Sequence, residues 1–257
     1  MTAALGAIVG MALVASAVAC SSSSKAGPTT TRGATTTSPA PGLGGFYAVP
    51  DPLPHGRPGA VIKTRPVVVS DVHGTMLRVM YHSRSVRGAD IAVTGLVAIP
   101  RAAPPKGGYP VISWAHGTTG IADTCAPSLH PGQAIPALNR LLDAGYLVVA
   151  TDYEGQGTPG RHPYIVGTSE GRGALDIVRA ARNLPQAHAS RRYLVWGHSQ
   201  GGHAALFAAG LAGKWAKGLK LRGTVAYAPA SHMAEQAGLL PALTSPSPLS
   251  ALASLIV

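Results

Sequence analysis

Residues 193–203 read Tyr-Leu-Val-Trp-Gly-His-Ser-Gln-Gly-Gly-His, and this segment constrains the fold of the 257-residue chain more than any other. Its apolar beginning predicts a buried strand, and the small residues after Gln200 predict a helix. Between them stands Ser199, with Gly197 and Gly201 two residues away on either side. Glycines at this spacing make room where a strand turns sharply into a helix and leave the serine hydroxyl exposed. The pattern predicts Ser199 as a nucleophile, and the strand and helix around it disfavour a glycine-rich turn with an incidental serine.

A second turn follows the short apolar strand predicted at 111–115. Residues 114–120 read Trp-Ala-His-Gly-Thr-Thr-Gly, so glycines flank two threonines. Such a turn can direct backbone N–H groups, or a threonine hydroxyl, toward an oxyanion that develops on a reacting carbonyl. The candidate donors are Gly117, Thr118 and Gln200, the last being the residue after the predicted nucleophile.

The order of the apolar runs predicts an α/β fold. The predicted strands are 65–70, 76–82, 91–99, 111–115, 147–151, 193–196 and 223–228. The predicted helices are 133–143, 169–183 and 200–212. Three strands come before the first helix, and strands then alternate with helices. An antiparallel beginning followed by alternation predicts a mostly parallel sheet with helices on both faces.

Residues 1–20 are interpreted as an export signal. No charged residue occurs between Thr2 and Ala19, and small residues lead into Cys20. The segment resembles a bacterial lipoprotein signal, in which Cys20 would become the lipidated first residue of the mature protein. The alternative is a retained membrane anchor, which is disfavoured because the many Ala and Gly residues make the run only weakly hydrophobic. Either interpretation predicts export, and stable anchoring through Cys20 would need two or more acyl chains.

The next segment, 21–45, contains 19 Ser, Thr, Gly or Pro residues and one bulky apolar residue, Leu43. It cannot bury enough apolar surface to offset the entropy of ordering, so it is predicted to be a disordered tether. Residues 46–230 are predicted to form the α/β core.

Charge and cysteine content exclude several functions. Lys and Arg number 21 against 10 Asp and Glu, so the formal net charge is +11. The basic residues are dispersed, with no run longer than Arg191–Arg192, which predicts no nucleic-acid partner and favours attraction to anionic lipid or envelope polymer. Cys20 and Cys125 lack the spacing of metal ligands, so no metal and no cofactor are expected.

Several polar residues are given structural interpretations. Glu170 is interpreted as a favourable charge in the first turn of the helix predicted at 169–183. Asp152 is interpreted as a cap on the loop that follows its strand. Charged residues on one side of the same helix are interpreted as a solvated face. They are Arg172, Asp176 and Arg179.

Three segments in this order resemble the secretory lipase family of α/β-hydrolases. They are residues 113–128, 151–160 and 196–202. The resemblance runs from about Val61 to Ala230. It implies an α/β-hydrolase fold and hydrolysis of carboxylic esters, with lipids or acylglycerols as substrates of a Ser199 acyl-enzyme. It also implies a cap after the strand at 223–228, so that residues 231–257 would begin the cap or lid.

The family position that matches Cys125 usually takes part in a disulfide, and Cys20 is the other cysteine of the sequence. In α/β-hydrolases the acid and the histidine of the triad follow the nucleophile along the chain. After Asp176 the sequence has no aspartate, its one later acid is Glu235, and no histidine follows Glu235. We therefore expect the base and acid to be absent from this chain, together with the C-terminal strands and most of the cap.

A rearranged base is the alternative, although His198 and His203 are interpreted as packing or rim residues of the turn. The candidates are His116, His198, His203 and His232. Two other functions remain open: an acyltransferase or peptidase on the same scaffold, and a noncatalytic surface lipoprotein that binds lipid or a partner. The oligomeric state is not indicated by the sequence.

Overall fold

The computed structural model describes residues 43–233 together with residues 235, 238 and 255. The predicted signal at 1–20 with Cys20, nearly all of the tether at 21–45, and most of the cap segment at 231–257 lie outside the described residues. Within the described part of the chain, no helix combines the length and the apolar character that a membrane span requires.

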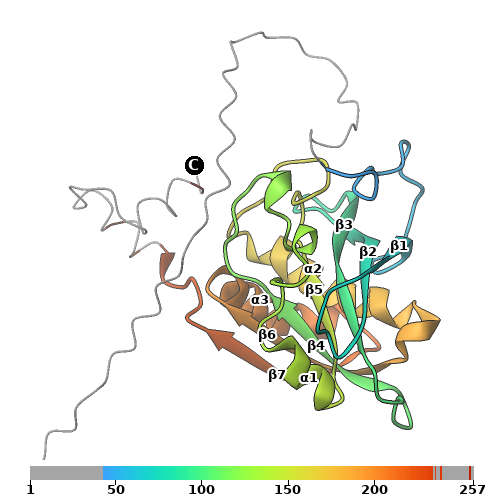
Figure 1. The fold of residues 1–257 in the computed structure, drawn as a ribbon. Coiled ribbons are helices and arrows are strands. Elements are labelled where there is room, and N and C mark those ends of the chain that lie inside the picture. The colour runs from blue at the N-terminus through green and yellow to red at the C-terminus, as the bar shows by residue number, and fades with distance from the viewer. Residues whose placement is uncertain (1–42, 234, 236–237, 239–254, 256–257) are drawn as a thin grey trace, which may run out of the picture.

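The described residues form seven strands and three α-helices (Figure 1). The strands are β1 (Val61–Val67), β2 (Gly74–Arg84), β3 (Asp90–Pro100), β4 (Tyr109–Ala115), β5 (Leu147–Thr151), β6 (Ala189–His198) and β7 (Lys220–Tyr227). The helices are α1 (Leu138–Asp143), α2 (Gly167–Arg182) and α3 (Gln200–Trp215). Short 3-10 turns lie at Asp123–Cys125, Pro127–Leu129 and Pro185–Ala187.

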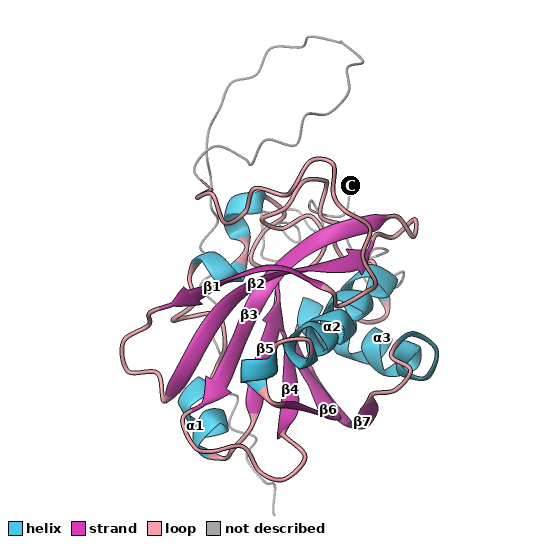
Figure 2. Ribbon diagram, turned by 90° about the vertical axis from the view of Figure 1, so that its right-hand side faces the viewer, coloured by secondary structure: helices cyan, strands magenta, loops and turns pink. Residues whose placement is uncertain are grey.

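The strands form one mixed sheet in the order β1-β2-β3-β5-β4-β6-β7 (Figure 2). β1, β2, β3 and β5 pair antiparallel in that order, whereas β5, β4, β6 and β7 pair parallel. The α/β class and the antiparallel beginning predicted from the sequence are confirmed. Because the carboxyl ends of parallel strands meet at one edge, the segments that follow β4, β5 and β6 converge there.

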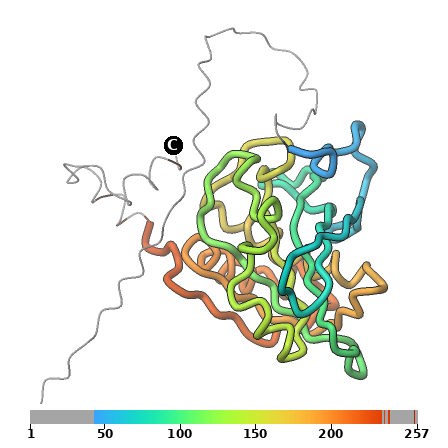
Figure 3. Tube along the Cα trace, in the orientation of Figure 1, coloured from blue at the N-terminus to red at the C-terminus, as the bar shows by residue number. Residues whose placement is uncertain are grey.

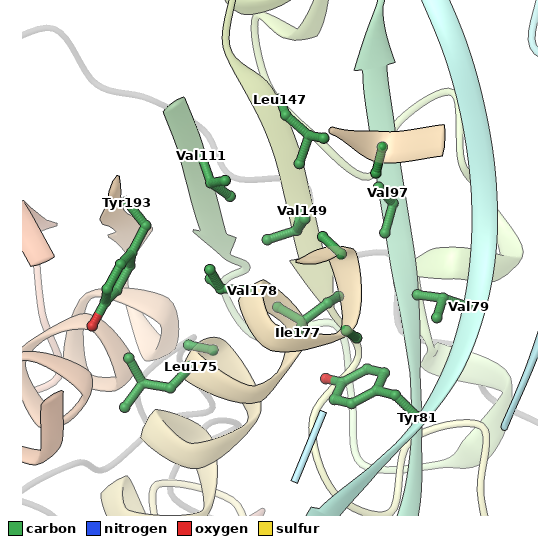
Figure 4. Close-up of a cluster of buried hydrophobic side chains, with 14 of the residues drawn as sticks. Val79, Tyr81, Val97, Val111, Leu147, Val149, Leu175, Ile177, Val178 and Tyr193 are labelled. Carbon is green, nitrogen blue, oxygen red and sulfur yellow. The ribbon is translucent and has the colours of Figure 1, made fainter. Parts of the chain in front are cut away.

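The helices lie on both faces of the sheet, with α1 on one face and α2 and α3 on the other (Figure 2). Alternate residues of a strand point to opposite faces. In β5, Val149 packs in the core beneath α2, whereas Val148 packs with Leu142 of α1. Figure 4 shows the larger cluster, in which Leu175 and Val178 of α2 lie against the strands.

The two edges of the sheet are remote from each other. In the trace of Figure 3, the segment before β1 and the segment containing β7 lie on opposite sides of the molecule. Among the described strands, β7 pairs with β6 alone. Its Val225 and Tyr227 are 52% and 61% exposed, so this edge presents apolar surface to solvent.

The helix predicted at 133–143 is wrong in its first half, because α1 begins at Leu138. Residues 131–136 form turns, and Ala137 adopts a left-handed conformation with φ 51°. Pro136 cannot donate a backbone hydrogen bond within a helix, which explains why the helix starts after it.

The interpretation of Asp176 as part of a solvated face is also wrong. Its carboxylate is fully buried and accepts hydrogen bonds from Ser83 Oγ at 2.8 Å and Trp215 Nε1 at 2.9 Å. Arg179 forms an ion pair with it at 2.5 Å. The guanidinium of Arg172 lies 4.7 Å from the centre of the Trp215 ring. Packing of α3 across α2 covers this side of the helix, which the local spacing of charges could not indicate.

Candidate active site

Ser199 stands between the end of β6 and the beginning of α3. Its backbone has φ 57° and ψ −120°, a conformation that few non-glycine residues adopt. A Cβ atom at Gly197 would overlap the carbonyl oxygen of Gly201, and one at Gly201 would overlap the carbonyl oxygen of Ala115. The strand and helix therefore approach so closely that neither glycine position admits a side chain. Ser199 itself is partly exposed at the tip of this turn.

The segment after β4 lies beside this turn because of the sheet register. Ala115 of β4 pairs with Gly197 of β6, so residues 116 and 117 come next to residues 198 and 199. A Cβ atom built on Gly117 would lie 3.6 Å from the Cβ of Ser199. The structure thus brings together the predicted nucleophile and the predicted oxyanion segment.

Several backbone N–H groups in this region have no hydrogen-bond acceptor among the described residues. Neither the N–H of Gly117 nor that of Thr118 makes a hydrogen bond with the residues that the structure describes. Gln200 is the first residue of α3, where backbone N–H groups have no acceptor within the helix. The hydroxyl of Thr118 is engaged, since it lies 2.7 Å from the Tyr164 hydroxyl. The backbone groups are therefore better placed than the threonine hydroxyl to receive a ligand oxygen.

The side chain of Gln200 belongs to a buried polar network. Its Nε2 lies 2.8 Å from Glu170 Oε1 and 2.9 Å from His162 Nε2. An amide NH₂ group only donates, so His162 Nε2 must accept and its Nδ1 must carry the proton. That Nδ1 donates to the Glu154 carbonyl oxygen at 2.8 Å, and burial lowers the pKa of His162, which favours the neutral ring. His203 Nδ1 completes the network at 2.7 Å from Glu170 Oε2.

Glu170 organises this network from the first turn of α2. It is fully buried, and its Oε1 also accepts the N–H of Ile165 at 3.1 Å. The interpretation of Glu170 as a simple helix-dipole charge is therefore incomplete, because its partners come mainly from α3 and from the loop before α2. Close contact between α2 and α3 explains why Glu170 reaches partners on α3. A Cβ on Gly171 would lie 2.9 Å from the backbone nitrogen of Ala208.

The four candidate bases differ in environment. His116 is buried with Nδ1 2.7 Å from the Gly117 carbonyl oxygen, and burial lowers its pKa to about 4. The ring is therefore neutral at pH 7, with Nδ1 donating to Gly117. His203 has a carboxylate partner in Glu170 and packs on Phe207, with ring centres 4.7 Å apart.

The other two candidates are exposed. His198 stacks on Tyr227 with ring centres 5.5 Å apart, and His232 Nδ1 lies 3.3 Å from Ser231 Oγ. Among the described residues, no histidine is hydrogen bonded to the Ser199 hydroxyl. His203 is thus the one member of this set of four that combines nearness to Ser199 in the chain with an orienting acid.

Asp152 does not cap the loop that follows it, so that interpretation is wrong. Its carboxylate accepts the N–H of Ser128 at 2.8 Å, the Ser128 hydroxyl, and the Thr94 hydroxyl at 2.7 Å. Burial raises its pKa to about 6. The segment at 123–129 folds over the end of β5, and this long-range contact takes the place of the expected local one.

Cys125 is buried in the 3-10 turn that precedes Ser128. A Cβ on Gly120 would approach the Cys125 sulfur at 2.5 Å, so these two positions are packed against each other. The described residues contain no group of three His, Cys, Asp or Glu side chains that could hold a metal ion.

Sequence reasoning missed Glu170 and His162 as members of the site. His162 carries no motif of its own, and its approach to Gln200 depends on the loop between β5 and α2. A signal for Glu170 does exist in the sequence. Gly167, Gly171 and Gly173 surround it, and repeated small residues on one helix indicate close packing against a neighbour.

Comparisons with known proteins agree with this architecture. The model of the family described as secretory lipase matches residues 132–240. Candida antarctica lipase A, in its closed state, superposes with a TM-score of 0.56 at 26% identity, covering 65% of this chain and 41% of that one. The esterase LipA of Xanthomonas oryzae, described as degrading rice cell walls, superposes with a TM-score of 0.60 at 22% identity and covers 72% of this chain and 53% of that one.

Two curated relatives are similar in sequence. Lipase A of Moesziomyces aphidis is 27% identical over 196 residues, which cover 69% of this chain and 41% of the relative. A probable inactive lipase of Mycobacterium tuberculosis is 26% identical over 206 residues, which cover 73% of this chain and 45% of the relative. The chain spans less than half the length of these two proteins. The described residues thus have the fold of α/β-hydrolase lipases and esterases, and residues 132–240 are similar to the secretory lipase family.

Proposed function

We propose that this chain carries the nucleophile and the oxyanion hole of a carboxylic ester hydrolase, a lipase or esterase that acts on lipid or acylglycerol esters. The observation that carries the proposal is the backbone of Ser199, held at φ 57° between β6 and α3 beside the segment at 116–118. Such a backbone costs on the order of 1–3 kcal/mol and is typical of positions where the strain serves function.

In the proposed reaction, the Ser199 oxygen attacks the ester carbonyl carbon as a base removes the hydroxyl proton. The tetrahedral oxyanion is stabilised by the N–H of Gln200 and by the N–H of Gly117 or Thr118. The C–O bond to the alcohol then breaks, the alcohol leaves with a proton, and an acyl-enzyme remains on Ser199. Water attacks the acyl carbon and releases the carboxylic acid.

The base and its orienting acid are proposed to come from outside this sequence. No histidine follows Glu235, so the usual order of triad residues has no counterpart after Ser199. His116 is disfavoured because its Nδ1 is committed to Gly117 and its pKa is lowered. His203 is disfavoured because its ring belongs to the buried Glu170 network.

The test is covalent capture of the acyl group on the full chain. With a p-nitrophenyl ester, we expect acylation of the Ser199 peptide by mass spectrometry, at the rate of about 10³–10⁴-fold over water that an oxyanion hole without a triad can support. Ser199→Ala should remove the adduct. A folded chain that gives no adduct, or an adduct that persists in Ser199→Ala, would refute the nucleophile.

A second experiment addresses the base. His116→Ala and His203→Ala are expected to change the acylation rate by less than about twofold if the base lies outside the chain, compared with the ~10²–10⁴-fold contribution of general-base catalysis. A loss of this larger size in a variant with an unchanged circular dichroism spectrum would identify that histidine as the base and contradict this part of the proposal.

A noncatalytic lipid-binding protein is the second candidate, favoured by the similarity to the probable inactive lipase of Mycobacterium tuberculosis. The two functions are separated by a chain-length series of esters together with the corresponding nonhydrolysable ethers. Binding of the ethers without any acylation by the esters would select the noncatalytic function.

We further propose that the protein is exported and lipidated at Cys20, which the secretory family and the sequence of residues 1–20 support. Labelling of growing cells with an alkyne fatty acid should modify the wild-type protein. Cys20→Ser should lose the label. Equal labelling of both proteins would overturn the assignment of Cys20.

A further inference from the structure

A cavity of about 500 Å³ lies where α2 and α3 end and where β6 begins. Residues 55–58 and Ala60, which precede β1, contribute to its wall. None of the described residues that line it is acidic, and five are cationic. The cations are Arg57, Arg179, Arg182, Arg191 and Lys217. Part of the chain's excess positive charge is therefore gathered in one concave place.

The cavity is remote from the candidate active site. Arg191 lies near the start of β6 and Ser199 follows its end, so eight steps of extended chain separate them. At about 3.3 Å per residue, this is a separation of about 26 Å. Substitutions in the cavity should therefore leave chemistry at Ser199 unchanged, and the cavity has no part in the proposed ester hydrolysis.

Helix stabilisation explains only part of this charge. Arg179 and Arg182 lie in the last turn of α2, where cations interact favourably with the helix dipole. Arg179 is also neutralised by its ion pair with Asp176. The other three cations come from three different parts of the chain, and the dipole of α2 does not account for their convergence.

One of them, Arg191, is held in position. Its Nε donates to the carbonyl oxygen of Gly218 at 2.7 Å. Gly218 has φ 87°, and a Cβ there would lie 3.2 Å from an Arg191 terminal nitrogen. The glycine thus permits both the turn and the close approach of the guanidinium, so this cation is fixed at the cavity before any ligand arrives.

The remaining three cations have no anionic partner within the described part of the chain. Arg57, Arg182 and Lys217 are exposed, and none makes an ion pair or a side-chain hydrogen bond with described residues. Like charges in a concave surface repel one another and concentrate a positive potential. A bound anion would relieve this repulsion.

We propose that this cavity is a binding site for the phosphate group of an anionic phosphate ester. Guanidinium groups match phosphate in a bidentate geometry, which favours phosphate over a compact monovalent anion where arginines predominate. A volume of about 500 Å³ falls within the range of small-molecule sites and exceeds what one phosphate fills. The phosphate could belong to an anionic lipid headgroup or to a free organic phosphate.

The experiment measures binding by the full chain to inorganic pyrophosphate, and separately to vesicles of phosphatidylcholine with or without phosphatidylglycerol, at about 0.15 M salt. The test variant is Arg57→Gln/Arg182→Gln/Lys217→Gln. The control is Arg87→Gln/Arg140→Gln/Lys106→Gln, which removes the same charges from exposed positions outside the cavity. We expect the test variant to bind pyrophosphate about tenfold or more weakly, corresponding to about 1.4 kcal/mol, and the control to change binding less than twofold.

Pyrophosphate binding that the test variant loses supports the site, and an additional loss of binding to phosphatidylglycerol vesicles assigns the phosphate to a lipid headgroup. Loss of vesicle binding alone would support the site for headgroups only. An equal loss in test and control variants would mean that net charge acts without a site, and would overturn the proposal. Absence of binding by the wild-type chain to both probes would also overturn it. The single variant Lys217→Gln, expected to weaken binding in the same direction, guards against misfolding of the triple variant.

Discussion

β6 joins two polar regions that handle charge in opposite ways. At its carboxyl end, Glu170 is fully buried and accepts hydrogen bonds from Gln200 and His203. At its amino end, Arg191 faces a cavity whose other cations are mostly exposed and lack carboxylate partners. The first region consists of desolvated groups that each need a partner, whereas the second consists of solvated charges that act over a distance.

The contrast shows that neighbouring elements can support both a buried hydrogen-bonded network and an exposed cationic cavity. α2 contributes to both regions, with Glu170 in its first turn and Arg179 and Arg182 in its last turn, and β6 runs between the two regions. Changes at the buried end should alter the free energy of unfolding by several kcal/mol. Changes at the exposed end should alter ligand binding while leaving stability nearly constant.

The largest expected effect comes from the turn at Ser199. Gly201→Ala places a Cβ on the carbonyl oxygen of Ala115. We expect a loss of about 4 kcal/mol or more in the free energy of unfolding, measured by urea denaturation, because backbone must move. Gly213→Ala in the same helix meets open space and should gain about 0.8 kcal/mol from helix propensity. A Gly201→Ala chain as stable as the wild type would contradict the close approach of β4 and α3.

A smaller effect is expected at the network itself. Glu170→Ala leaves the buried donors of Gln200 and His203 without their acceptor, and should cost about 3 kcal/mol. The matched control is Asp143→Ala, which removes an ion pair to His73 whose acid is 59% exposed. That change should cost less than about 0.5 kcal/mol. If urea titrations gave equal losses in the free energy of unfolding for the two variants, the buried Glu170 network would be no more stabilising than an exposed ion pair, which would contradict the prediction.

The third prediction concerns the pH dependence of stability. Burial raises the pKa of Asp152 to about 6, from an ordinary value of 3.8. Between these values the folded state binds more protons than the unfolded state, so this group lowers stability as the pH rises from about 4 to about 6. For Asp90, hydrogen bonds from Gly56 and His82 and the charge of Arg84 outweigh burial and lower the pKa. Asp90 therefore stabilises the folded state above its ordinary pKa, and this stabilisation is lost as the pH falls through the lowered pKa.

The two acids should therefore respond with opposite sign. In the wild type, Asp152 should lower the free energy of unfolding between pH 4 and pH 6 by on the order of 1.4 kcal/mol for each unit by which its pKa is raised. Asp152→Asn should remove this decline, so the stability curve of the variant should be flatter than that of the wild type over this range. Asp90→Asn should instead remove stability at pH 6, and this loss should become smaller as the pH falls through the lowered pKa of Asp90. Urea titrations at these pH values measure both. Parallel curves for Asp152→Asn and the wild type would show that the Asp152 carboxyl titrates normally.

The smallest effect is expected at the cavity. Lys217→Gln should raise the free energy of unfolding by about 0.3 kcal/mol at low salt, because it relieves repulsion among the lining cations, and the gain should vanish in high salt. Lys106→Gln, an exposed lysine outside the cavity, should show no such salt-dependent gain. A destabilised Lys217→Gln chain would mean that the lysine is favourably paired.

Local patterns predicted the features that depend on neighbouring residues. The strand, Ser199 and helix were predictable because apolar residues, two glycines and small residues follow one another within a short segment. The alternation of strands and helices predicted the sheet for the same reason. The beginning of α1 was missed by a few residues. Pro136 is a signal for this boundary in the sequence, whereas the left-handed conformation of Ala137 has no clear signal in its side chain.

Long-range contacts could not be predicted in this way. The partners of Asp152 come from Thr94 and Ser128, and the partner of Asp176 in β2 is Ser83. A charge spacing on one helix does not reveal which side another element covers. Glu170 is the intermediate case, since the surrounding glycines indicated close packing but not the identity of its partners.

The central position of β5 has a consequence for hydrogen exchange. All five of its residues are buried, and it pairs with β3 on one side and β4 on the other. Its amide protons should exchange with deuterium only when the whole domain unfolds, whereas amides of the edge strand β7 should exchange through local opening. Because Asp152 and Tyr153 follow β5 directly, the loop beside Ser199 is attached to the most slowly exchanging segment. The reacting groups would then keep their relative positions through the faster local fluctuations of the sheet edge.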